Sequence, residues 1–409
     1  MALVFASFSG GGIERSMLQL SRGFLAQGLA VDLVVGEAKG ELSEEVPEGA
    51  VVTETEPSSL WRVRLAALAA DRAALGLLMT RNLRPLKPLR RLRRLPALVR
   101  YLKSARPDAV LAAEAHHNLM MVWARHLAGL DCRIVLSEHV QASLHESRFN
   151  PWASPDLLPL LRRAYLKADA IVAVSDGLAD DLAARAELPR NRITRVYNPV
   201  VGPELLLKAE QQIDHPWFAT GAPPVILGAG RLHPQKDFAT LVRALAELRS
   251  RRPARLVILG ARTDPEYALT LQALATELGV AHDVEMPGFA HNPFAFMSRA
   301  AVFVLSSRYE GLGNVLIEAL ACGTPVVSTA CPSGPAEVLD DGRFGPLVPV
   351  GDVAALARAI EDVLDDPPAA ERLRARAGLF TVERAVDHYL RLLFPPQNEI
   401  RLTGGGIVS

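Results

Sequence analysis

The sequence predicts an α/β protein with two Rossmann-like domains whose parallel sheets face a central cleft. Short apolar runs of strand length alternate with segments of helical periodicity along the chain, the pattern expected of parallel sheets covered by helices. The alternation stops between residues 200 and 224, where turn-forming residues are frequent, and then resumes. This break divides the chain into two α/β halves of similar length. In such folds, ligands bind at the carboxyl ends of the strands.

The first half is assigned to one domain, residues 1–205. Its first helix has the clearest pattern, because apolar residues recur at helical spacing from Ile13 to Phe24 while charged residues take the opposite face. Apolar runs predict six strands in this domain, near residues 3–7, 30–35, 109–112, 133–137, 170–174 and 193–196.

The second half is assigned to a domain at residues 206–380, which opens with a linker that reaches Pro224. A last segment, residues 381–409, holds a helix at about 381–394 that could pack on either half, and a glycine-rich tail expected to be frayed. Five strands are predicted in the second domain, near residues 225–228, 255–259, 284–286, 301–306 and 325–328.

The composition describes a soluble globular chain and excludes several classes of protein. Of the 409 residues, 49% are hydrophobic, which is too many for a disordered chain. Lys and Arg number 45, as do Asp and Glu, so binding of nucleic acid by the molecule as a whole is not expected. The 3 cysteines fit neither a zinc site nor a redox pair and indicate a reduced, cytosolic protein. No apolar run approaches the roughly 18 residues of a spanning helix.

The segment 306–325 is the most informative in the chain. A predicted strand ends at Ser306, a glycine-containing loop follows, and a helix begins near Asn314, whose side chain suits an N-cap. Backbone N–H groups at such a helix start hold phosphate well, so an anion site is predicted here. Glu318 is the single charge in the apolar helix and needs a partner that offsets its desolvation. Sugar hydroxyls would serve, and a neighbouring loop or an arginine is the alternative.

Two further loops at strand ends carry candidate ligands for phosphate. Arg231 and Lys236 lie in the turn after the first strand of the second domain, where both can reach one diphosphate. The alternative is a solvated loop with two ordinary surface cations. The first turn of the chain, residues 9–15, lacks the GxGxxG pattern of a dinucleotide site. Its backbone at Gly11 and Gly12 is expected to approach a phosphate or a sugar.

The histidines and aspartates give weaker signals. His139 follows a first-domain strand, at a position where polar residues often touch substrate, although a lone histidine is more often structural. His116 and His117 are adjacent, so their side chains would diverge on a helix, and a structural role is favoured for both. Three aspartate doublets have no histidine or third carboxylate nearby, so no metal site is assigned.

A basic segment, residues 61–106, carries thirteen Lys or Arg and a single acid, Asp71. Leucines alternate with cations in its densest part, a combination that docks on anionic lipid. Membrane docking is therefore the preferred interpretation. A solvated helical hairpin is one alternative, and a nucleic-acid patch is another that the scarcity of aromatic residues disfavours. The cations expected to contact lipid are Arg84, Lys87, Arg90, Arg91, Arg93 and Arg94.

At these motifs the chain resembles family 4 of the retaining glycosyltransferases, which have the GT-B fold of two facing Rossmann-like domains. The resemblance covers most of the chain and extends to members that build bacterial cell-surface glycans. It is carried by Gly230-Arg231 with Lys236 and by Pro287-Gly288-Phe289. Above all, it is carried by Glu310-x7-Glu318 followed by Ala-Leu-Ala-Cys-Gly-Thr-Pro-Val-Val. Motifs in this order and context are highly specific.

The resemblance implies that the second domain binds a nucleoside-diphosphate sugar, most often a UDP-sugar, without a further cofactor or a metal. Arg231 and Lys236 would hold the diphosphate, Glu310 would position the donor sugar, and Glu318 would bind the ribose. His139 would occupy the position of the active-site histidine. The complete donor site would comprise Gly11, Gly12, Gly230, Arg231, Lys236, Gly288, Phe289, Glu310, Gly311, Leu312, Gly313, Asn314, Val315 and Glu318.

Such a transferase would retain the anomeric configuration without a protein nucleophile. The leaving diphosphate would help to deprotonate the acceptor, and Arg231, Lys236 and the helix start would stabilise its charge. The first domain would bind a glycan or lipid-linked acceptor, as in lipopolysaccharide synthesis. The protein would then be cytoplasmic and peripheral at the anionic inner face of the membrane, with the last helix bracing the first domain.

Three other functions fit parts of the sequence. A UDP-sugar epimerase shares the two-domain architecture and would act without an acceptor. A noncatalytic sugar-nucleotide sensor would keep the same binding residues. A nicotinamide-dependent oxidoreductase would also use Rossmann-like halves, but the missing dinucleotide fingerprint disfavours it.

Overall fold

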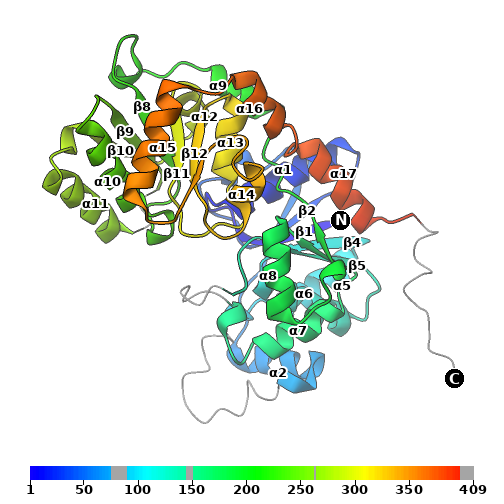
Figure 1. The fold of residues 1–409 in the computed structure, drawn as a ribbon. Helices are drawn as coiled ribbons and strands as arrows, with labels where there is room; N and C mark the ends of the chain where they lie inside the picture. Colours follow the sequence, from blue (N-terminus) through cyan, green and yellow to red (C-terminus); the bar gives the residue numbers. More distant parts are fainter. Residues whose placement is uncertain (75–89, 144–150, 262–263, 397–409) are drawn as a thin grey trace. The chain divides into compact units, whose positions relative to one another are not determined.

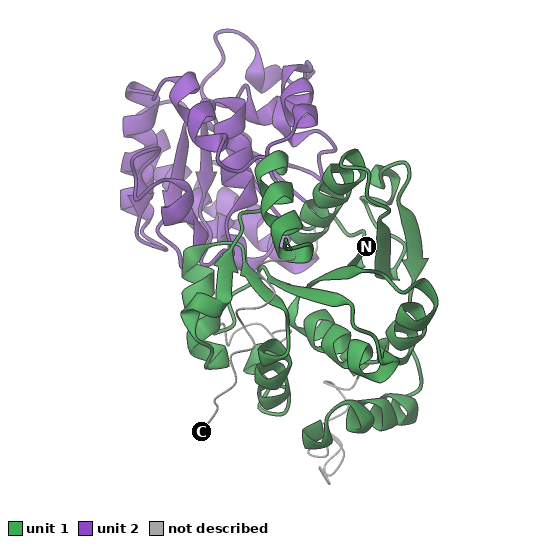
Figure 2. Cartoon of the chain, turned by 90° about the vertical axis from the view of Figure 1, so that its right-hand side faces the viewer, with its two compact units in different colours: residues 1–199, 382–409 green, residues 200–381 purple. Residues whose placement is uncertain are grey.

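The computed structural model describes residues 1–74, 90–143, 151–261 and 264–396. The chain forms two compact units, shown in separate colours in Figure 2. The first comprises residues 1–199 and 382–409, and the second comprises residues 200–381. The expected boundary between residues 205 and 206 falls inside a helix of the second unit, Pro203–Glu210. The chain changes units before this helix because the N–H groups of Val200 and Val201 both donate to the carbonyl of Phe380, at 3.0 and 2.9 Å.

The first unit contains a seven-stranded parallel sheet in the order β3-β2-β1-β4-β5-β6-β7. One of these strands, β3, is not among the six predicted from the sequence. It pairs with β2 alone and its residues are mostly exposed, so it lacks the apolar run that marks the other strands. The strands are β1 (Ala2–Ser7), β2 (Asp32–Glu37), β3 (Val51–Glu54), β4 (Ala109–Ala113), β5 (Arg133–Glu138), β6 (Ala170–Ala173) and β7 (Ile193–Arg195).

The last long helix of the chain, α17 (Val382–Leu393), packs on the first unit, against the first helix α1 (Gly12–Ala26) (Figure 1). Gly23 permits this approach, because a Cβ atom there would lie 2.3 Å from Cγ2 of Val386. The other α-helices among the described residues of this unit are α2 (Leu60–Ala70), α5 (Leu95–Ala105), α6 (Ala115–Ala128), α7 (Leu158–Leu166) and α8 (Asp176–Ala186).

The second unit contains a six-stranded parallel sheet in the order β10-β9-β8-β11-β12-β13, and its core joins this sheet to α10, α11 and α15. The strands are β8 (Val225–Ala229), β9 (Arg255–Leu259), β10 (Val284–Gly288), β11 (Val302–Leu305), β12 (Val326–Thr329) and the two-residue β13 (Leu347–Val348), which the sequence analysis missed. The helices are α9 (Pro203–Glu210), α10 (Phe238–Arg249), α11 (Pro265–Glu277), α12 (Pro293–Met297), α13 (Asn314–Cys322), α14 (Gly334–Val338), α15 (Val353–Asp365) and α16 (Ala370–Ala377).

Each sheet has one point at which the strand order reverses direction. In the first sheet the point lies between β1 and β4, and in the second it lies between β8 and β11. The connections from these neighbouring strands leave in opposite directions, which opens a crevice at the carboxyl ends where ligands bind in open α/β sheets. The two α/β halves expected from the sequence are therefore present, each with its own switch point.

The described part of the chain contains no helix that is both long and apolar enough to cross a bilayer. All three cysteines are buried and free.

Candidate active site

Lys236 and Glu310 meet at the switch point of the second sheet. Lys236 ends a short 3-10 turn, Pro234–Lys236, after β8, while Glu310 lies in the loop after β11. Nζ of Lys236 lies 2.6 Å from Oε1 of Glu310, and the two side chains are 13% and 10% exposed. The structure thus joins two residues that the sequence placed 74 positions apart.

Hydrogen bonds hold the two loops together around this pair. Oγ of Ser307 donates to Oε1 of Glu310 at 2.6 Å. Oγ of Ser306 donates to the carbonyl of Lys236 at 2.8 Å, and Nε2 of Gln235 donates to the carbonyl of Tyr309 at 3.0 Å. The position of the ammonium group is therefore fixed by the backbone as well as by the carboxylate.

Gly230 makes the close approach of the Lys236 side chain possible. Its φ of +149° disfavours other residues, and a Cβ atom there would lie 2.8 Å from Cε of Lys236. Arg231 follows in the same turn and is exposed. The turn therefore presents one sheltered cation and one solvent-accessible cation at the end of β8.

The start of α13 lies at the end of the loop that carries Glu310. Gly313, with φ of +90°, is the residue before the helix, and Asn314 is its first residue rather than the expected N-cap. A glycine takes this left-handed conformation without strain, so the turn into the helix needs no side-chain cap. Leu312 is buried, and its backbone contacts Gly334 so closely that a Cβ atom there would lie 2.1 Å from the Leu312 carbonyl oxygen.

Gly311, Asn314 and Val315 are partly exposed beside the positive end of the α13 dipole, as an anion site requires. Glu318 lies one turn further along α13 and is 9% exposed. Burial and then the negative charge of Glu318 raise the pKa of the nearby Cys322 thiol to about 12. The carboxylate is thus enclosed in the apolar helix that the sequence indicated.

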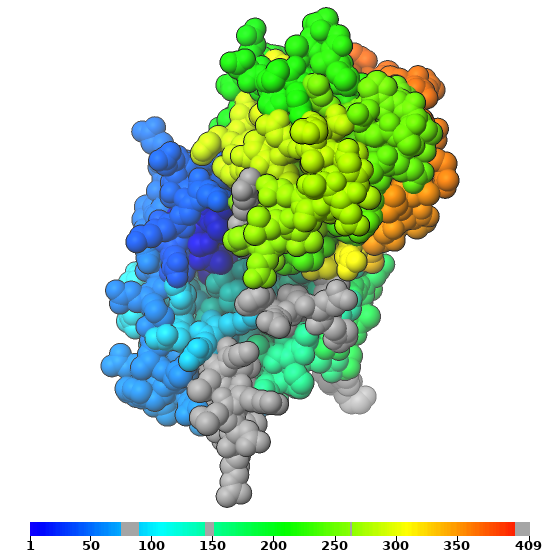
Figure 3. Space-filling model, turned by 90° about the vertical axis from the view of Figure 1, so that its left-hand side faces the viewer, coloured from blue at the N-terminus to red at the C-terminus, as the bar shows by residue number. Residues whose placement is uncertain are grey.

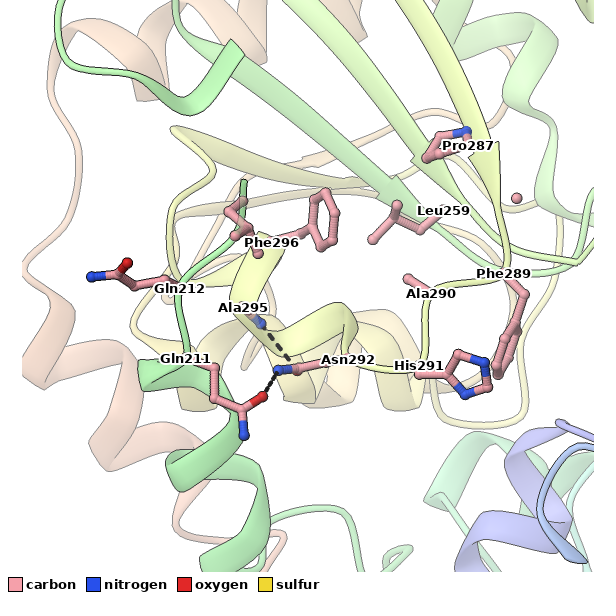
Figure 4. Close-up of a pocket in the computed structure, with 12 residues that line it drawn as sticks. Gln211, Gln212, Leu259, Pro287, Phe289, Ala290, His291, Asn292, Ala295 and Phe296 are labelled. Atoms are coloured by element: carbon pink, nitrogen blue, oxygen red, sulfur yellow. Dashed lines mark hydrogen bonds between the residues drawn. The ribbon is translucent and has the colours of Figure 1, made fainter. Parts of the chain in front are cut away.

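A cavity of about 320 Å³ lies at the end of β10, and Gly288 and Phe289 line it (Figure 4). The ring of Phe289 meets the ring of His291 edge-on, with centroids 5.2 Å apart. On the other side, Nδ2 of Asn292 donates to Oε1 of Gln211 at 2.8 Å. An aromatic face with amide groups nearby suits a planar, polar ring such as a nucleobase.

In the first unit, Gly11 ends the loop between β1 and α1, and Gly12 is the first residue of α1, at the switch point of the first sheet. The N–H of Gly11 donates to the carbonyl of Ser9 at 2.8 Å, and Oγ of Ser9 donates to Oε1 of Glu14 at 3.0 Å. A Cβ atom at Gly11 would lie 2.3 Å from Oε2 of Glu14, so a side chain there would displace the Glu14 carboxylate.

His139 is buried immediately after β5. Its Nε2 lies 2.8 Å from Oγ of Ser137, which also contacts the hydroxyl group of Tyr389 at 3.2 Å. Burial lowers the pKa of His139 to about 4, so its imidazole is neutral at pH 7. The ring can accept or donate a hydrogen bond there, but it does not carry a charge.

The expectation that His116 and His117 diverge is wrong. Their ring centroids lie 4.0 Å apart, and both rings are close to Glu114. The helix begins only at Ala115, so both histidines are in its first turn, where Glu114 and the carbonyl of Ala113 draw the rings together. Glu114 is not among the residues predicted from the sequence, although it directly follows an apolar strand.

Four of the six cations expected to contact lipid lie in the described part of the chain; Arg84 and Lys87 lie outside it. Arg90 is exposed and Arg91 is half-buried. Arg93 and Arg94 have internal partners. Nε of Arg93 donates a hydrogen bond to the carbonyl of Ser58 at 2.8 Å. A terminal nitrogen of Arg94 donates one to the carbonyl of Gly36 at 2.6 Å. These two arginines therefore fasten the segment to its own unit.

Two family models match the chain and together cover most of it. The model described as Glycosyltransferase Family 4 matches residues 10–201, and the model described as Glycosyl transferases group 1 matches residues 209–379. The Lys236–Glu310 pair and helix α13 lie within the second match. Neither match is to an epimerase, so that alternative is not favoured.

Two curated proteins illustrate the similarity in sequence. The lipopolysaccharide core biosynthesis glycosyltransferase LpsE of Rhizobium meliloti is 36% identical over 239 residues, which are 57% of this chain and 66% of LpsE. The N-acetylgalactosamine-N,N'-diacetylbacillosaminyl-diphospho-undecaprenol 4-alpha-N-acetylgalactosaminyltransferase of Campylobacter jejuni is 32% identical over 251 residues, 61% of this chain and 65% of that protein. The chain thus matches slightly less than two thirds of the length of each.

Among solved structures, HepE of Anabaena, described in complex with UDP and glucose, superimposes with a TM-score of 0.72. It is 21% identical, and the superposition covers 96% of this chain and 99% of HepE. At that identity the likeness establishes the GT-B fold, with a Rossmann-like α/β architecture in each unit.

Proposed function

Because the chain belongs to glycosyltransferase family 4, we propose that it is a retaining transferase that moves a sugar from a UDP-sugar to a lipid-linked or cell-surface glycan acceptor. The observation that carries this proposal is the Lys236–Glu310 pair at the switch point of the second sheet, 2.6 Å apart and beside the start of α13. The cation and the helix N-terminus suit the diphosphate of a nucleotide sugar, and the carboxylate suits the hydroxyl groups of its sugar.

In this proposal the donor lies along the carboxyl edge of the second sheet. Lys236 and Arg231 hold the diphosphate, with the N–H groups at the start of α13. Glu310 accepts hydrogen bonds from the donor sugar, and Glu318 accepts them from the ribose. The base stacks near Phe289 in the 320 Å³ cavity. A UDP-sugar is preferred because HepE, which shares the fold, is described with UDP and glucose bound.

The reaction needs charge to be stabilised on the leaving group rather than a protein nucleophile. The bond between the anomeric carbon and the diphosphate oxygen breaks, the acceptor hydroxyl oxygen bonds to that carbon on the same face, and its proton passes to the departing diphosphate. Fixed cations aimed at the developing charge lower the barrier most, because they need no reorganisation. Lys236, Arg231 and the helix dipole supply this charge, so the proposal requires no metal ion.

Glu310 has a double role in this scheme. Before the donor binds, it holds the Lys236 ammonium group in place; once the diphosphate arrives, the ammonium group gains a second anion. Glu310 then accepts a hydrogen bond from a hydroxyl group of the donor sugar and so positions the anomeric carbon. His139, neutral at pH 7, is assigned to orient a hydroxyl near the reacting atoms rather than to donate a charge.

The acceptor is proposed to lie at the cytoplasmic face of the membrane. LpsE and the Campylobacter transferase are named for lipopolysaccharide core and for a diphospho-undecaprenol substrate, respectively. The N-terminal part of the chain, in blue, reaches the surface on the face shown in Figure 3. Helix α2 supports peripheral docking, because Trp61 and Leu65 are 59% and 60% exposed beside two arginines. An aromatic and a leucine next to cations suit the interface of an anionic bilayer.

Binding of nucleotide sugars to the purified protein tests the donor assignment. Isothermal titration would compare UDP-glucose, UDP-galactose, UDP-N-acetylglucosamine, GDP-mannose and ADP-glucose. We expect selective binding of UDP-sugars, lost in Lys236→Ala and Glu318→Gln but kept in the exposed control Glu371→Gln. Acceptor-dependent release of UDP then distinguishes a transferase from a noncatalytic sensor. A folded wild type that binds none of the five would refute the proposed function.

A further inference from the structure

Glu114 lies at the switch point of the first sheet, directly after β4. Its backbone has φ of 75° and ψ of 139°, a combination that favours glycine. Two hydrogen bonds hold it there, because its N–H donates to the carbonyl of Ser137 at 3.2 Å and its carbonyl accepts from the N–H of Asn118 at 2.9 Å. Glycine would relieve this strain, so the presence of a glutamate side chain calls for a separate reason.

The carboxylate of Glu114 has unused capacity to accept hydrogen bonds. Its Oε2 is buried and has no hydrogen-bond partner among the residues that the structure describes. The nearest ring nitrogens are Nδ1 of His117 at 3.4 Å and Nε2 of His116 at 4.0 Å. Nδ1 of His117 also lies 3.2 Å from the carbonyl of Ala113, which attracts its hydrogen away from the carboxylate.

The surroundings keep this carboxylate ionised and two nearby imidazoles, those of His116 and His139, neutral at pH 7. Burial raises the pKa of Glu114, but the contact with His117 outweighs burial and holds the pKa below its ordinary value. Burial lowers the pKa of His116 to about 3, and that of His139 to about 4. A carboxylate beside neutral imidazoles offers both acceptors and donors, which is the chemistry that recognises hydroxyl groups.

We propose that Glu114 binds a hydroxyl group of the acceptor sugar and thereby sets acceptor specificity. This inference rests on the proposed transferase function and identifies a residue of its acceptor site. Glu114 occupies the switch point of the first sheet as the Lys236–Glu310 pair occupies that of the second. A buried carboxylate oxygen without a partner gains a hydrogen bond when a sugar O–H donates to it, so an acceptor without that hydroxyl is rejected.

A divalent cation is the competing ligand, because Glu114, His116 and His117 offer ligand atoms within 4.8 Å of one another. Two observations disfavour it. Arg91 and Arg94 lie close enough for their positive charge to lower the pKa of His116, and the same charge repels a cation. In addition, the hydrogen on Nδ1 of His117 is directed at a carbonyl, which removes that nitrogen as a ligand.

Acceptor binding can be measured separately from donor binding in the full-length protein. The probes are lipopolysaccharide core oligosaccharide and diphospho-undecaprenol-linked N-acetylgalactosamine in detergent, titrated in the presence of UDP. Glu114→Gln is expected to lower the affinity for whichever probe the wild type binds by at least tenfold. Its affinity for the UDP-sugar should stay within twofold of wild type. Glu187→Gln is the matched control, because Glu187 is also a non-glycine residue at positive φ but is exposed.

Glu114→Gly separates ligand recognition from a structural role. Glycine adopts the observed backbone without strain, so this variant should be at least as stable as wild type and still lose the probe. A stable Glu114→Gly protein with wild-type probe affinity would overturn the inference, as would a wild type that binds UDP-sugar but neither probe. So would tight Zn²⁺ binding that Glu114→Gln abolishes without changing probe affinity. Loss of UDP-sugar binding in wild type itself would instead refute the proposed function.

Discussion

Nζ of Lys236 lies 2.6 Å from Oε1 of Glu310, although the two residues follow different strands, β8 and β11. Those strands are neighbours at the switch point of their sheet, so the fold brings together two loops that the chain separates by 74 positions. Each side chain shelters the other from solvent. The pair therefore keeps a cation in a partly desolvated position, where it interacts strongly with an arriving diphosphate.

Lys236→Met should lower both the stability of the protein and its affinity for a UDP-sugar. Without the ammonium group, the Glu310 carboxylate keeps the hydroxyl of Ser307 as a partner but loses its compensating charge. Removing one member of a buried ion pair costs about 3–5 kcal/mol of folding free energy. Urea unfolding and calorimetric titration measure the two effects, with Lys103→Met as an exposed control.

The double variant Lys236→Met, Glu310→Gln should recover stability without recovering donor binding. A neutral pair of similar size removes the uncompensated charge, so the free energy of unfolding should return to within about 1 kcal/mol of wild type. The diphosphate still lacks its cation, and binding should stay weak. If binding returned together with stability, Lys236 would have only a structural role.

Gly230→Ala should impair donor binding through the same lysine. The glycine has φ of +149°, and an added Cβ atom would lie 2.8 Å from Cε of Lys236 and 3.2 Å from its Cδ. We expect a loss of about 1–3 kcal/mol in stability and a displaced ammonium group. Gly221→Ala is the matched control, because Gly221 also has positive φ, +81°, but has no atom within 4 Å of the added Cβ. Equal losses of donor binding in both variants would contradict this prediction.

Most strands could be predicted from the sequence because they are buried on both faces and read as continuous apolar runs. The exceptions have physical reasons. β3 is an exposed edge strand, and β13 has two residues. Helix α9 was hidden because it is short and the residues after Glu210 form a linker with frequent turn signals, although proline suits the first turn of a helix.

The site could be predicted where one short segment carried the signal, as in the loop and helix around Glu310. The contact between Glu310 and Lys236 depends on strand order, which local patterns do not reveal. Glu114 was missed because its importance lies in a backbone conformation and in a buried oxygen without a partner. Neither property is visible in the letters Glu-Ala-His-His.

The stability of the first unit should depend on pH through Glu138. The Glu138 side chain is buried. Its carboxyl group accepts a hydrogen bond from the hydroxyl of Tyr165 and a second, at 3.2 Å, from Nδ2 of Asn118. Burial raises its pKa from 4.5 to about 8, so between these values the folded protein holds a proton that the unfolded chain has lost. Its contribution to stability is therefore complete below pH 4.5 and falls as the pH rises towards 8.

Glu138→Gln should flatten this dependence, because the amide cannot ionise. The fall in the free energy of unfolding between pH 5 and pH 8 should be smaller in the variant than in wild type, by an amount on the order of a few kcal/mol, since one pKa unit corresponds to ~1.4 kcal/mol. Urea unfolding at several pH values gives this difference directly. The exposed Glu204→Gln serves as control, and parallel curves for wild type and Glu138→Gln would show that the carboxyl is not protonated in the folded state.

Membrane docking through α2 predicts a loss of vesicle binding on removal of its two exposed apolar side chains. Trp61 and Leu65 should each contribute about 1.5–3 kcal/mol to the free energy of vesicle binding if they are buried in the bilayer interface. The double variant Trp61→Ala, Leu65→Ala should therefore reduce partitioning at least tenfold. Cosedimentation with vesicles containing phosphatidylglycerol measures this loss, and Leu207→Ala, an exposed leucine of the second unit, is the control.

Arg90→Glu should weaken binding at low salt and have less effect at high salt, because ions screen an exposed charge but leave apolar burial intact. Vesicle binding that resists both the double alanine variant and Arg90→Glu would place the docking surface elsewhere on the protein.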